Sequence, residues 1–250
     1  MLLNKKGEAE NLNNKESKQN QIIFMGLIIF ILIIVGFIYW KGISEPAELK
    51  QYLVGKTNEQ QDVIKYFYGP GGFLTKRITD QEYDSLVATV SNKTDFKQRA
   101  INKFGIDESE VQEIKPVNLL GYKFAGNIWS KKGKDGVWRS SAYEIAWIFC
   151  SSSQLYAYKH TFNMDENKTS EKAEEYFYKD ITNLTEVNQS VESKTFKSGK
   201  VVNETVDSTV FSIAVPGIDA SERFTSAYYD NDDTKRALQG LKSKLREKKS

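Results

Sequence analysis

Two segments decide the fold of this chain: VWRSSAYEIAWIFC, residues 137–150, and QLYAYKHTF, residues 154–162. Both are rich in aromatic and β-branched residues, which are typical of strands. The serines between them, Ser151–Ser153, suit a tight connection because small polar residues readily adopt turn conformations. The two segments therefore predict an antiparallel β-hairpin.

This hairpin also holds the single cysteine and the single histidine of the chain, Cys150 and His160. A three-residue loop would set Cys150 opposite Gln154 and His160 opposite Glu144. At about 3.4 Å per residue, the thiol and the imidazole would then lie roughly 20 Å apart. A nucleophile and its base need hydrogen-bond contact, about 3 Å. We therefore predict a turn here rather than a catalytic pair, and no GxSxG motif accompanies the serines.

Further strand-like segments surround the hairpin. Before it lies VNLLGYKFAGNIWS, residues 117–130, followed by the glycine-containing turn KKGKDG. After it come EYFYKDITNL at 175–184, SKTFKSGKVVNE at 193–204 and STVFSIAVPG at 208–217. These give about seven strands without an intervening helix. Such a sheet must be antiparallel, and it must close as a barrel or stack as a sandwich to hide its apolar face.

Helical periodicity fills the region before the strands, residues 59–115. The segment ITDQEYDSLVATV, residues 78–90, repeats apolar side chains at helical spacing, and Thr79 with Glu82 has the spacing of a capping box. A second helix, TDFKQRAINKFG, ends at Gly105, the usual kind of residue after a helix C-terminus. The sequence thus predicts a helical leader in front of the strands.

An amphipathic helix is predicted at residues 230–250, DNDDTKRALQGLKSKLREKKS. Leu238, Leu241 and Leu245 form one narrow apolar stripe, and seven Lys and Arg occupy the other faces. The acidic start, Asp230–Asp233, suits a helix cap better than a calcium loop, which also requires a glycine and a distal glutamate. The stripe needs a partner, and the simplest one is the open end of a barrel.

This order of elements resembles the pleckstrin-homology-like (PH-like) barrel, the fold that also includes GRAM domains. More specifically, INKFGIDESEVQEIKPVNLLGY, EEYFYKDIT and LKSKLREKK resemble segments of an uncharacterised group of bacterial membrane-anchored proteins that join a helical leader to such a barrel. The likeness covers roughly residues 96–249. It implies an α+β fold in which an antiparallel seven-stranded PH-like barrel is capped by the C-terminal amphipathic helix. It also implies a binding or scaffolding role, since no catalytic motif is part of it.

An uncharged apolar run, IIFMGLIIFILIIVGFIYW, occupies residues 22–40. A helix needs roughly 20 apolar residues to cross a bilayer, whereas a signal-peptide core has about 7–15 and a small-residue cleavage site. The following YWKGISEPAEL is a poor cleavage site, so the run predicts an uncleaved single-pass transmembrane helix. Lysines flank it almost evenly. Keeping the short lysine-bearing tail in the cytoplasm is favoured, which would place the soluble domain on the extracytoplasmic side.

These segments divide the chain into five parts. We expect a disordered polar tail over residues 1–21, because it has few large apolar residues, and the transmembrane helix over 22–40. A linker over 41–58 and the helical leader over 59–115 would lead to the PH-like barrel with its C-terminal helix over 116–250.

Composition narrows the class of protein. Thirty-five basic against 33 acidic residues give a net charge of +2, so nucleic acid is not an expected partner. One cysteine excludes a zinc site built on several thiolates. No catalytic residue, cofactor or metal site is therefore assigned. Aromatic residues at alternating strand positions, among them Trp129, are expected mainly in the core, with a peptide or carbohydrate platform as the alternative.

The candidate contact site is basic. Lys131, Lys132 and Lys134 lie in the first hairpin loop, and Arg139 begins the next strand. The same region binds inositol phosphates in some PH domains, although their lipid-specific basic spacing is not reproduced here. These four residues are the predicted contacts to an anionic ligand, and a solvated turn is the alternative. The closing run KSKLREKKS could also touch anionic lipid.

The sequence therefore predicts a single-pass protein of the cell membrane whose PH-like domain is a non-enzymatic binding or scaffolding module. Its expected partner is a protein, a peptide or an anionic lipid. One alternative is an enzyme with an unrecognised carboxylate site, for which Asp180, Glu144 and Asp230 are candidates. Another is a structural subunit of an envelope or secretion assembly.

Overall fold

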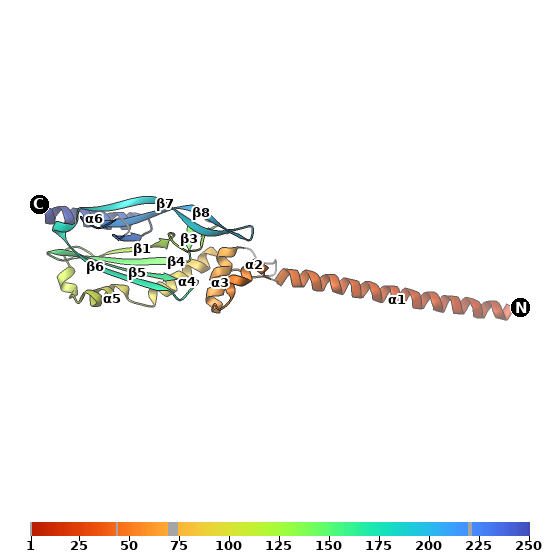
Figure 1. The fold of residues 1–250 in the computed structure, drawn as a ribbon. Coiled ribbons are helices and arrows are strands. Elements are labelled where there is room, and N and C mark those ends of the chain that lie inside the picture. Colours follow the sequence, from red (N-terminus) through yellow and green to blue (C-terminus); the bar gives the residue numbers. More distant parts are fainter. Residues whose placement is uncertain (1, 44, 70–74, 220–221) are drawn as a thin grey trace. The chain divides into compact units, whose positions relative to one another are not determined.

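A computed structural model describes residues 2–43, 45–69, 75–219 and 222–250, with side chains from Lys18 onward (Figure 1). The chain divides into two compact units, Met1–Pro46 with Pro70–Lys76 and Ala47–Gly69 with Arg77–Ser250. Helix α1 belongs to the first unit, and the described strands and other helices belong to the second.

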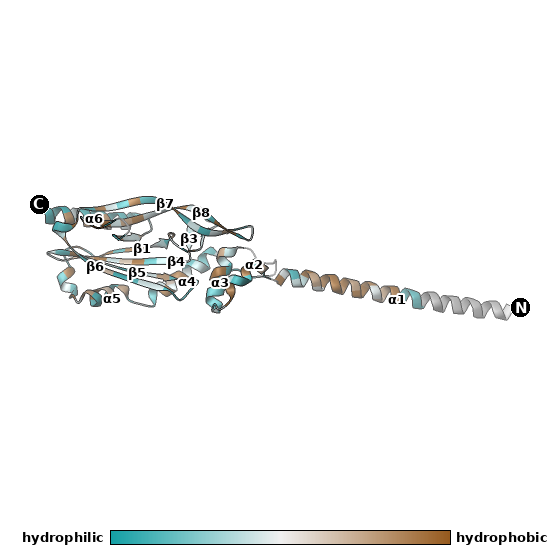
Figure 2. Ribbon diagram, in the orientation of Figure 1, coloured by the Kyte–Doolittle hydropathy of each residue, from teal (hydrophilic) through white to brown (hydrophobic). Residues whose placement is uncertain are grey.

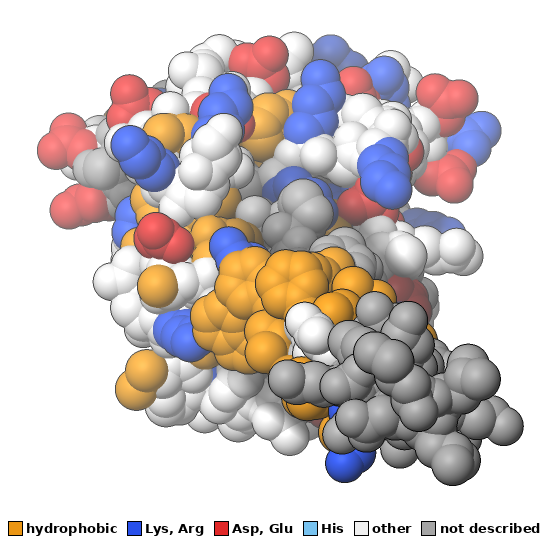
Figure 3. All heavy atoms as spheres, turned by 90° about the vertical axis from the view of Figure 1, so that its right-hand side faces the viewer, with side chains coloured by type: hydrophobic (Ala, Val, Ile, Leu, Met, Phe, Trp, Pro, Cys, Tyr) orange, Lys and Arg blue, Asp and Glu red, His pale blue; other side chains and the backbone are white. Residues whose placement is uncertain are grey.

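The first unit contains the long helix α1 (Leu2–Ile43). Its part Lys18–Ile43 is long and apolar enough to cross a membrane, and none of its most apolar window is buried inside the protein. Hydrophobic residues follow one another along this part (brown in Figure 2), and Figure 3 shows their side chains, in orange, from the N-terminal end. A signal sequence would give the same kind of helix. The structure thus shows a candidate membrane span.

The same helix continues through the segment that composition predicts to be a disordered tail, since the chain is helical from Leu2 onward. Extending an existing helix is far easier than nucleating one, because each added residue brings one more backbone hydrogen bond. The helix formed by the apolar run therefore continues toward the N-terminus through the polar residues.

Four antiparallel strands form the central sheet of the second unit, in the order β1 (Val117–Lys123), β4 (Ala142–Cys150), β5 (Gln154–Asn163), β6 (Thr169–Phe177). The predicted hairpin is its β4–β5 pair. In β4 every residue but Trp147 is buried, which means that this strand is covered on both faces.

A second, three-stranded sheet has the order β7 (Asn183–Lys197), β8 (Lys200–Ala214), β9 (Phe224–Ala227), and β7 and β8 are joined at the predicted Ser198–Gly199 turn. A small hairpin of β2 (Ser130–Lys132) and β3 (Trp138–Ser140) forms the third sheet. Short 3-10 turns lie at Glu108–Val111 (η1) and Tyr178–Asp180 (η2).

One face of the central sheet packs against the three-stranded sheet and helix α6 (Asp232–Lys249), as the layers of Figure 1 show. The predicted leucine stripe of α6 is buried in this core. The core is closed by apolar side chains from both sheets and the helix, among them Leu119, Ile148, Leu155, Phe211, Ile213, Phe224, Leu238, Leu241 and Leu245.

The other face of the central sheet is covered by helices α3 (Asn58–Tyr68), α4 (Asp80–Asn92) and α5 (Phe96–Phe104), and α2 (Ala47–Leu53) packs on α3. Capping boxes begin α3 at Thr57 and α4 at Thr79. Gly105 ends α5 with a φ of 65°, which a glycine adopts without strain. The predicted leader helices are therefore layers of the same body as the strands.

The predicted α+β class and the antiparallel sheets are confirmed, but the seven-stranded barrel is not formed: the described residues contain nine strands in three open sheets. The physical reason is that helices already cover the second face of the central sheet. A sheet buried on both faces has no exposed apolar face to hide by rolling up.

The connection between β9 and α6 covers the free edge of β1. Here Tyr229 donates its backbone N–H to the carbonyl of Leu120 at 2.8 Å. A Cβ added to Gly121 of β1 would lie 2.7 Å from the backbone N and Cα of Tyr228. Only glycine permits so close an approach of two backbones.

We expect Gly121→Ala to lower the free energy of unfolding by about 1–3 kcal/mol, because the opposing atoms are backbone and cannot yield cheaply. Gly240→Ala in α6 is the matched control. Its added Cβ meets nothing within 4 Å, and alanine should stabilise the helix by about 0.5–1 kcal/mol. Denaturant unfolding of the solubilised protein, followed by tryptophan fluorescence, measures both. Equal effects would contradict the close approach.

Candidate functional site

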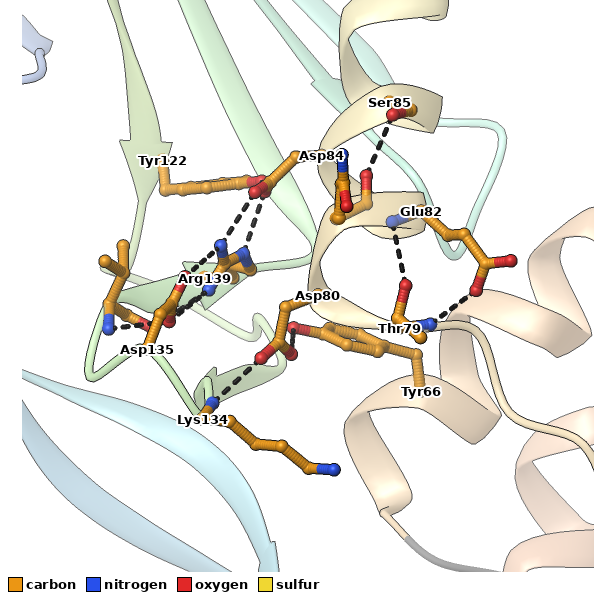
Figure 4. A network of polar contacts seen from close by, with 12 residues as sticks. Tyr66, Thr79, Asp80, Glu82, Asp84, Ser85, Tyr122, Lys134, Asp135 and Arg139 are labelled. Atoms are coloured by element: carbon orange, nitrogen blue, oxygen red, sulfur yellow. Dashed lines mark hydrogen bonds and ion pairs between the residues drawn. The ribbon is translucent and has the colours of Figure 1, made fainter.

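The basic residues predicted as ligand contacts all lie on the β2–β3 hairpin, where Arg139 is 4% exposed (Figure 4). Its guanidinium donates to both oxygens of Asp84 at 2.8 and 2.7 Å and to both oxygens of Asp135 at 2.9 and 2.7 Å. These hydrogen bonds hold the pKa of Asp135 at about 2 and raise that of Arg139. Arg139 therefore joins the hairpin to α4, with its donors directed into the protein.

Lys131 is also engaged within the protein. Its ammonium donates to the carbonyl oxygen of Tyr66 at 3.0 Å and lies 4.0 Å from the centroid of that ring. Burial lowers the pKa of Lys131. The side chains of Lys132 and Lys134 are exposed, while the backbone N–H of Lys134 donates to Asp80 at 2.8 Å. The fold thus brings the four predicted contacts together but leaves only Lys132 and Lys134 directed outward.

Replacement of Arg139 by lysine tests this interpretation. A lysine cannot make paired hydrogen bonds to two carboxylates, so we expect Arg139→Lys to lower the free energy of unfolding by about 1–3 kcal/mol. The matched change Lys132→Arg on the same hairpin should stay within about 0.5 kcal/mol of the wild type. Thermal and denaturant unfolding measure both variants. An unaffected Arg139→Lys protein would show that the pairing does not hold the hairpin.

Most basic side chains of α6 are likewise paired within the protein, which bears on the suggested lipid contact. The ammonium of Lys249 donates to the carbonyl of Ile181. The ion pairs of this helix are Lys235–Asp230, Arg236–Asp233, Lys242–Glu186, Lys244–Glu113, Lys244–Glu247 and Lys248–Glu113. The basic run therefore fastens α6 to the protein, and it offers little unpaired charge for a membrane surface.

Cys150 and His160 lie on opposite faces of the central sheet. The register pairs Cys150 with Leu155 and His160 with Ile145, one residue away from the predicted pairing. The reason is a tighter loop, in which Ser151 donates its N–H to the carbonyl of Gln154 at 2.9 Å. Cys150 faces the core between the sheets, where burial raises the pKa of its thiol to about 11. His160 faces the helices, so the two side chains cannot meet.

His160 packs against α5, with its ring centroid 4.8 Å from that of Phe96. It is buried, its Nδ1 has no hydrogen-bond partner among the described residues, and burial lowers its pKa. The charged groups beside it are Arg99 and Glu171, which pair at 2.7 Å. The pKa of Glu171 is about 2, chiefly because of its hydrogen bond with Arg99.

This arrangement predicts a pH dependence. Because the folded pKa of His160 lies below the unfolded value of about 6.5, the unfolded chain binds more protons, and stability should fall as pH drops below that value. Glu171 stays ionised throughout this window. His160→Phe keeps a ring against Phe96 and removes the only histidine. The free energy of unfolding, measured from pH 7.5 to 5, should decline less in this variant. Parallel declines would exclude His160 as the cause.

Two hollows adjoin at one end of the second unit, sharing Asn127 and Glu166 on their rims. The first, here called the aromatic hollow, has a volume of about 280 Å³ and is lined by Tyr52 of α2, Ile64 of α3 and Trp129. The Tyr52 ring meets the Trp129 ring edge-on at 5.2 Å. Val54, 79% exposed, stands on its rim.

Charged groups also line the aromatic hollow: Lys56, Asp165, Glu166 and Lys194. Lys56 donates to the carbonyl of Asp165 at 2.9 Å, and the ammonium of Lys194 lies 5.5 Å from the Trp129 ring centroid. Burial raises the pKa of Asp165. The hollow therefore combines the side chains of Tyr52, Ile64 and Trp129 with balanced charges, a mixture that is common at protein interfaces.

The second hollow, here called the lysine hollow, has a volume of about 220 Å³ and is lined by Lys123, Thr161, Asn163, Lys168 and Ser170, besides the shared rim. Next to it lies Glu144, 4% exposed, whose carboxylate accepts from the N–H of Ala227 at 2.9 Å. Within the described ranges, no group of three or more His, Cys, Asp and Glu is arranged to hold a metal ion.

A scan against protein-family models, a search of curated proteins and a search of solved structures found no match for this chain. The resemblance to PH-like proteins therefore stays a prediction. Of the hollow residues, the sequence singled out only Trp129, as a core aromatic with a platform as the alternative. A signal for the lysine hollow was present in β5. On the face toward the three-stranded sheet, Lys159 and Thr161 follow the apolar residues Leu155 and Ala157.

Proposed function

We propose that the protein is a membrane-tethered, non-enzymatic binding module whose aromatic hollow receives an apolar side chain of a protein or peptide partner. In this proposal, α1 is an uncleaved anchor, and the second unit is the binding part on the extracytoplasmic side. The observation that carries it is the hollow itself, which is lined by Tyr52, Ile64 and Trp129 together with charged residues of both signs. Pockets of this composition are favoured for side chains that anchor interfaces.

The place of the hollow in the chain gives further support. Its wall residues Gln51 and Tyr52 belong to α2, and only residues 44–46 separate α2 from the end of α1. An anchor so near in sequence would keep the hollow close to a membrane surface. A non-enzymatic role is consistent with the candidate carboxylates, because Glu144 and Asp230 are engaged with Ala227 and Lys235.

Site-specific photo-crosslinking tests the proposal in cells that produce the full chain. A photoreactive amino acid at Gln51, exposed on the hollow wall, should give one discrete adduct. The same residue at Gln239, exposed on α6, is the matched control and should not give that adduct. Val54→Asp should reduce the adduct at Gln51 at least about fivefold, because a carboxylate replaces an apolar rim contact.

The same adduct from both positions, or an undiminished adduct in Val54→Asp, would contradict the aromatic hollow as the docking site. Mass spectrometry of the adduct decides the class of partner. A protein supports the proposal, whereas an adduct with lipid alone would overturn the protein or peptide assignment.

A further inference from the structure

The face of the central sheet that packs against the three-stranded sheet, here called the inward face, changes from apolar to polar along its length. Cross-strand partners share a face, and successive rows of this face can be read from the register. One row contains Glu144, Thr161 and Ser170, and the next contains Lys123, Ala142 and Asn163. The apolar core between the two sheets ends at the first of these rows, where the N–H of Ala227 at the end of β9 meets Glu144. The lysine hollow lies over the polar rows.

The charge of Glu144 is compensated without Lys123. Its carboxylate accepts from Ala227 N–H at 2.9 Å and from the Thr161 hydroxyl at 3.3 Å, and it lies 3.5 Å from the ammonium of Lys159. Lys123 is farther, at 3.9 Å, and its side chain is more than one-third exposed. The ammonium of Lys123 therefore keeps donor capacity toward the hollow.

The other charges of the lysine hollow leave a positive excess. Glu166 accepts a hydrogen bond from the side-chain amide of Asn163 at 2.7 Å, which directs this carboxylate toward the β5–β6 turn. Lys168 is exposed, and in the part of the chain that the structure describes, no carboxylate lies within ion-pair distance of it. Two lysines thus oppose one carboxylate, and Ser170 and Asn127 add uncharged donors around the same space.

We propose that the lysine hollow binds an oxyanion group, the phosphate of a small polar ligand, between Lys123 and Lys168. Lysine ammonium groups bind phosphate as point charges, and neighbouring hydroxyl and amide donors complete the contacts. Lys123 and Ser170 project from paired strands, so the register of the sheet sets where their side chains begin around the hollow. This site differs from the β2–β3 hairpin that the sequence singled out. It also differs from the aromatic hollow, so either proposal can fail alone.

Thermal unfolding of the solubilised full chain tests the site. Inorganic phosphate and glycerol 3-phosphate, a lipid-headgroup mimic, are titrated separately against sodium chloride of equal ionic strength. We expect a saturable rise of the melting temperature with at least one of them. Lys168→Gln should weaken the apparent affinity at least about tenfold, because a hydrogen bond to a charged group is lost. Lys132→Gln, the matched control on the hairpin, should bind like the wild type.

Stabilisation by inorganic phosphate supports a soluble phosphate ligand, and stabilisation by glycerol 3-phosphate alone supports a headgroup. No saturable shift with either, or equal affinity in Lys168→Gln and wild type, would overturn the proposal. Loss in Lys132→Gln but not in Lys168→Gln would assign phosphate to the predicted hairpin instead. Because Lys168 is exposed and its substitution should leave the fold intact, unaltered melting of the unliganded variant serves as the folding control.

Discussion

Burial of β4 on both faces is the constraint on which the rest of the structure depends. Its odd-numbered residues, such as Tyr143 and Ile145, face the helices, and its even-numbered residues, such as Ala146 and Ile148, face the second sheet. Because side chains alternate along a strand, the sequence of β4 determines which residues pack against the helices and which pack against the second sheet. A shift of one residue in register would exchange the two sets, so strand register and layer order are specified together.

Charged side chains connect the layers at a few defined points. Arg139 joins β3 to α4 through Asp84, and Glu144 joins the central sheet to β9 through the N–H of Ala227. Buried charges bring little net stability, because their desolvation offsets most of their attraction. We infer that they contribute specificity, since each satisfies its partner in only one arrangement of the layers.

Local signals made much of the fold predictable. The Thr79 capping box, Gly105 and the Ser198–Gly199 turn depend on neighbouring residues, and each lies where the sequence predicted it. The predicted barrel is not formed, and local sequence signals could not have shown this because they do not specify which elements cover a sheet. The run AYEIAWIFC carried a hint, since a strand apolar at nearly every position is buried on both faces.

The candidate sites were harder to predict for the same reason. Tyr52 and Glu166 belong to polar segments far apart in sequence, and only tertiary packing brings them to the hollow that also contains Trp129. The sequence predicted Arg139 as a contact to an anionic ligand, because it cannot show that Asp84 and Asp135 both pair with this side chain. In β5, one face changes from apolar residues to Lys159 and Thr161, and this change was the better clue to a polar cavity.

The ion pairs of α6 with Glu113 also have a consequence for folding. They tie a helix that follows all the described strands to a residue that precedes β1. We expect contacts between such distant residues to form late in folding, because a long loop must close before they can be made. The leucines of α6 belong to the core between the two sheets. In that order of events the core would stay open until α6 packs on it, and a chain at that stage would expose apolar sheet surface to chaperones or to other chains.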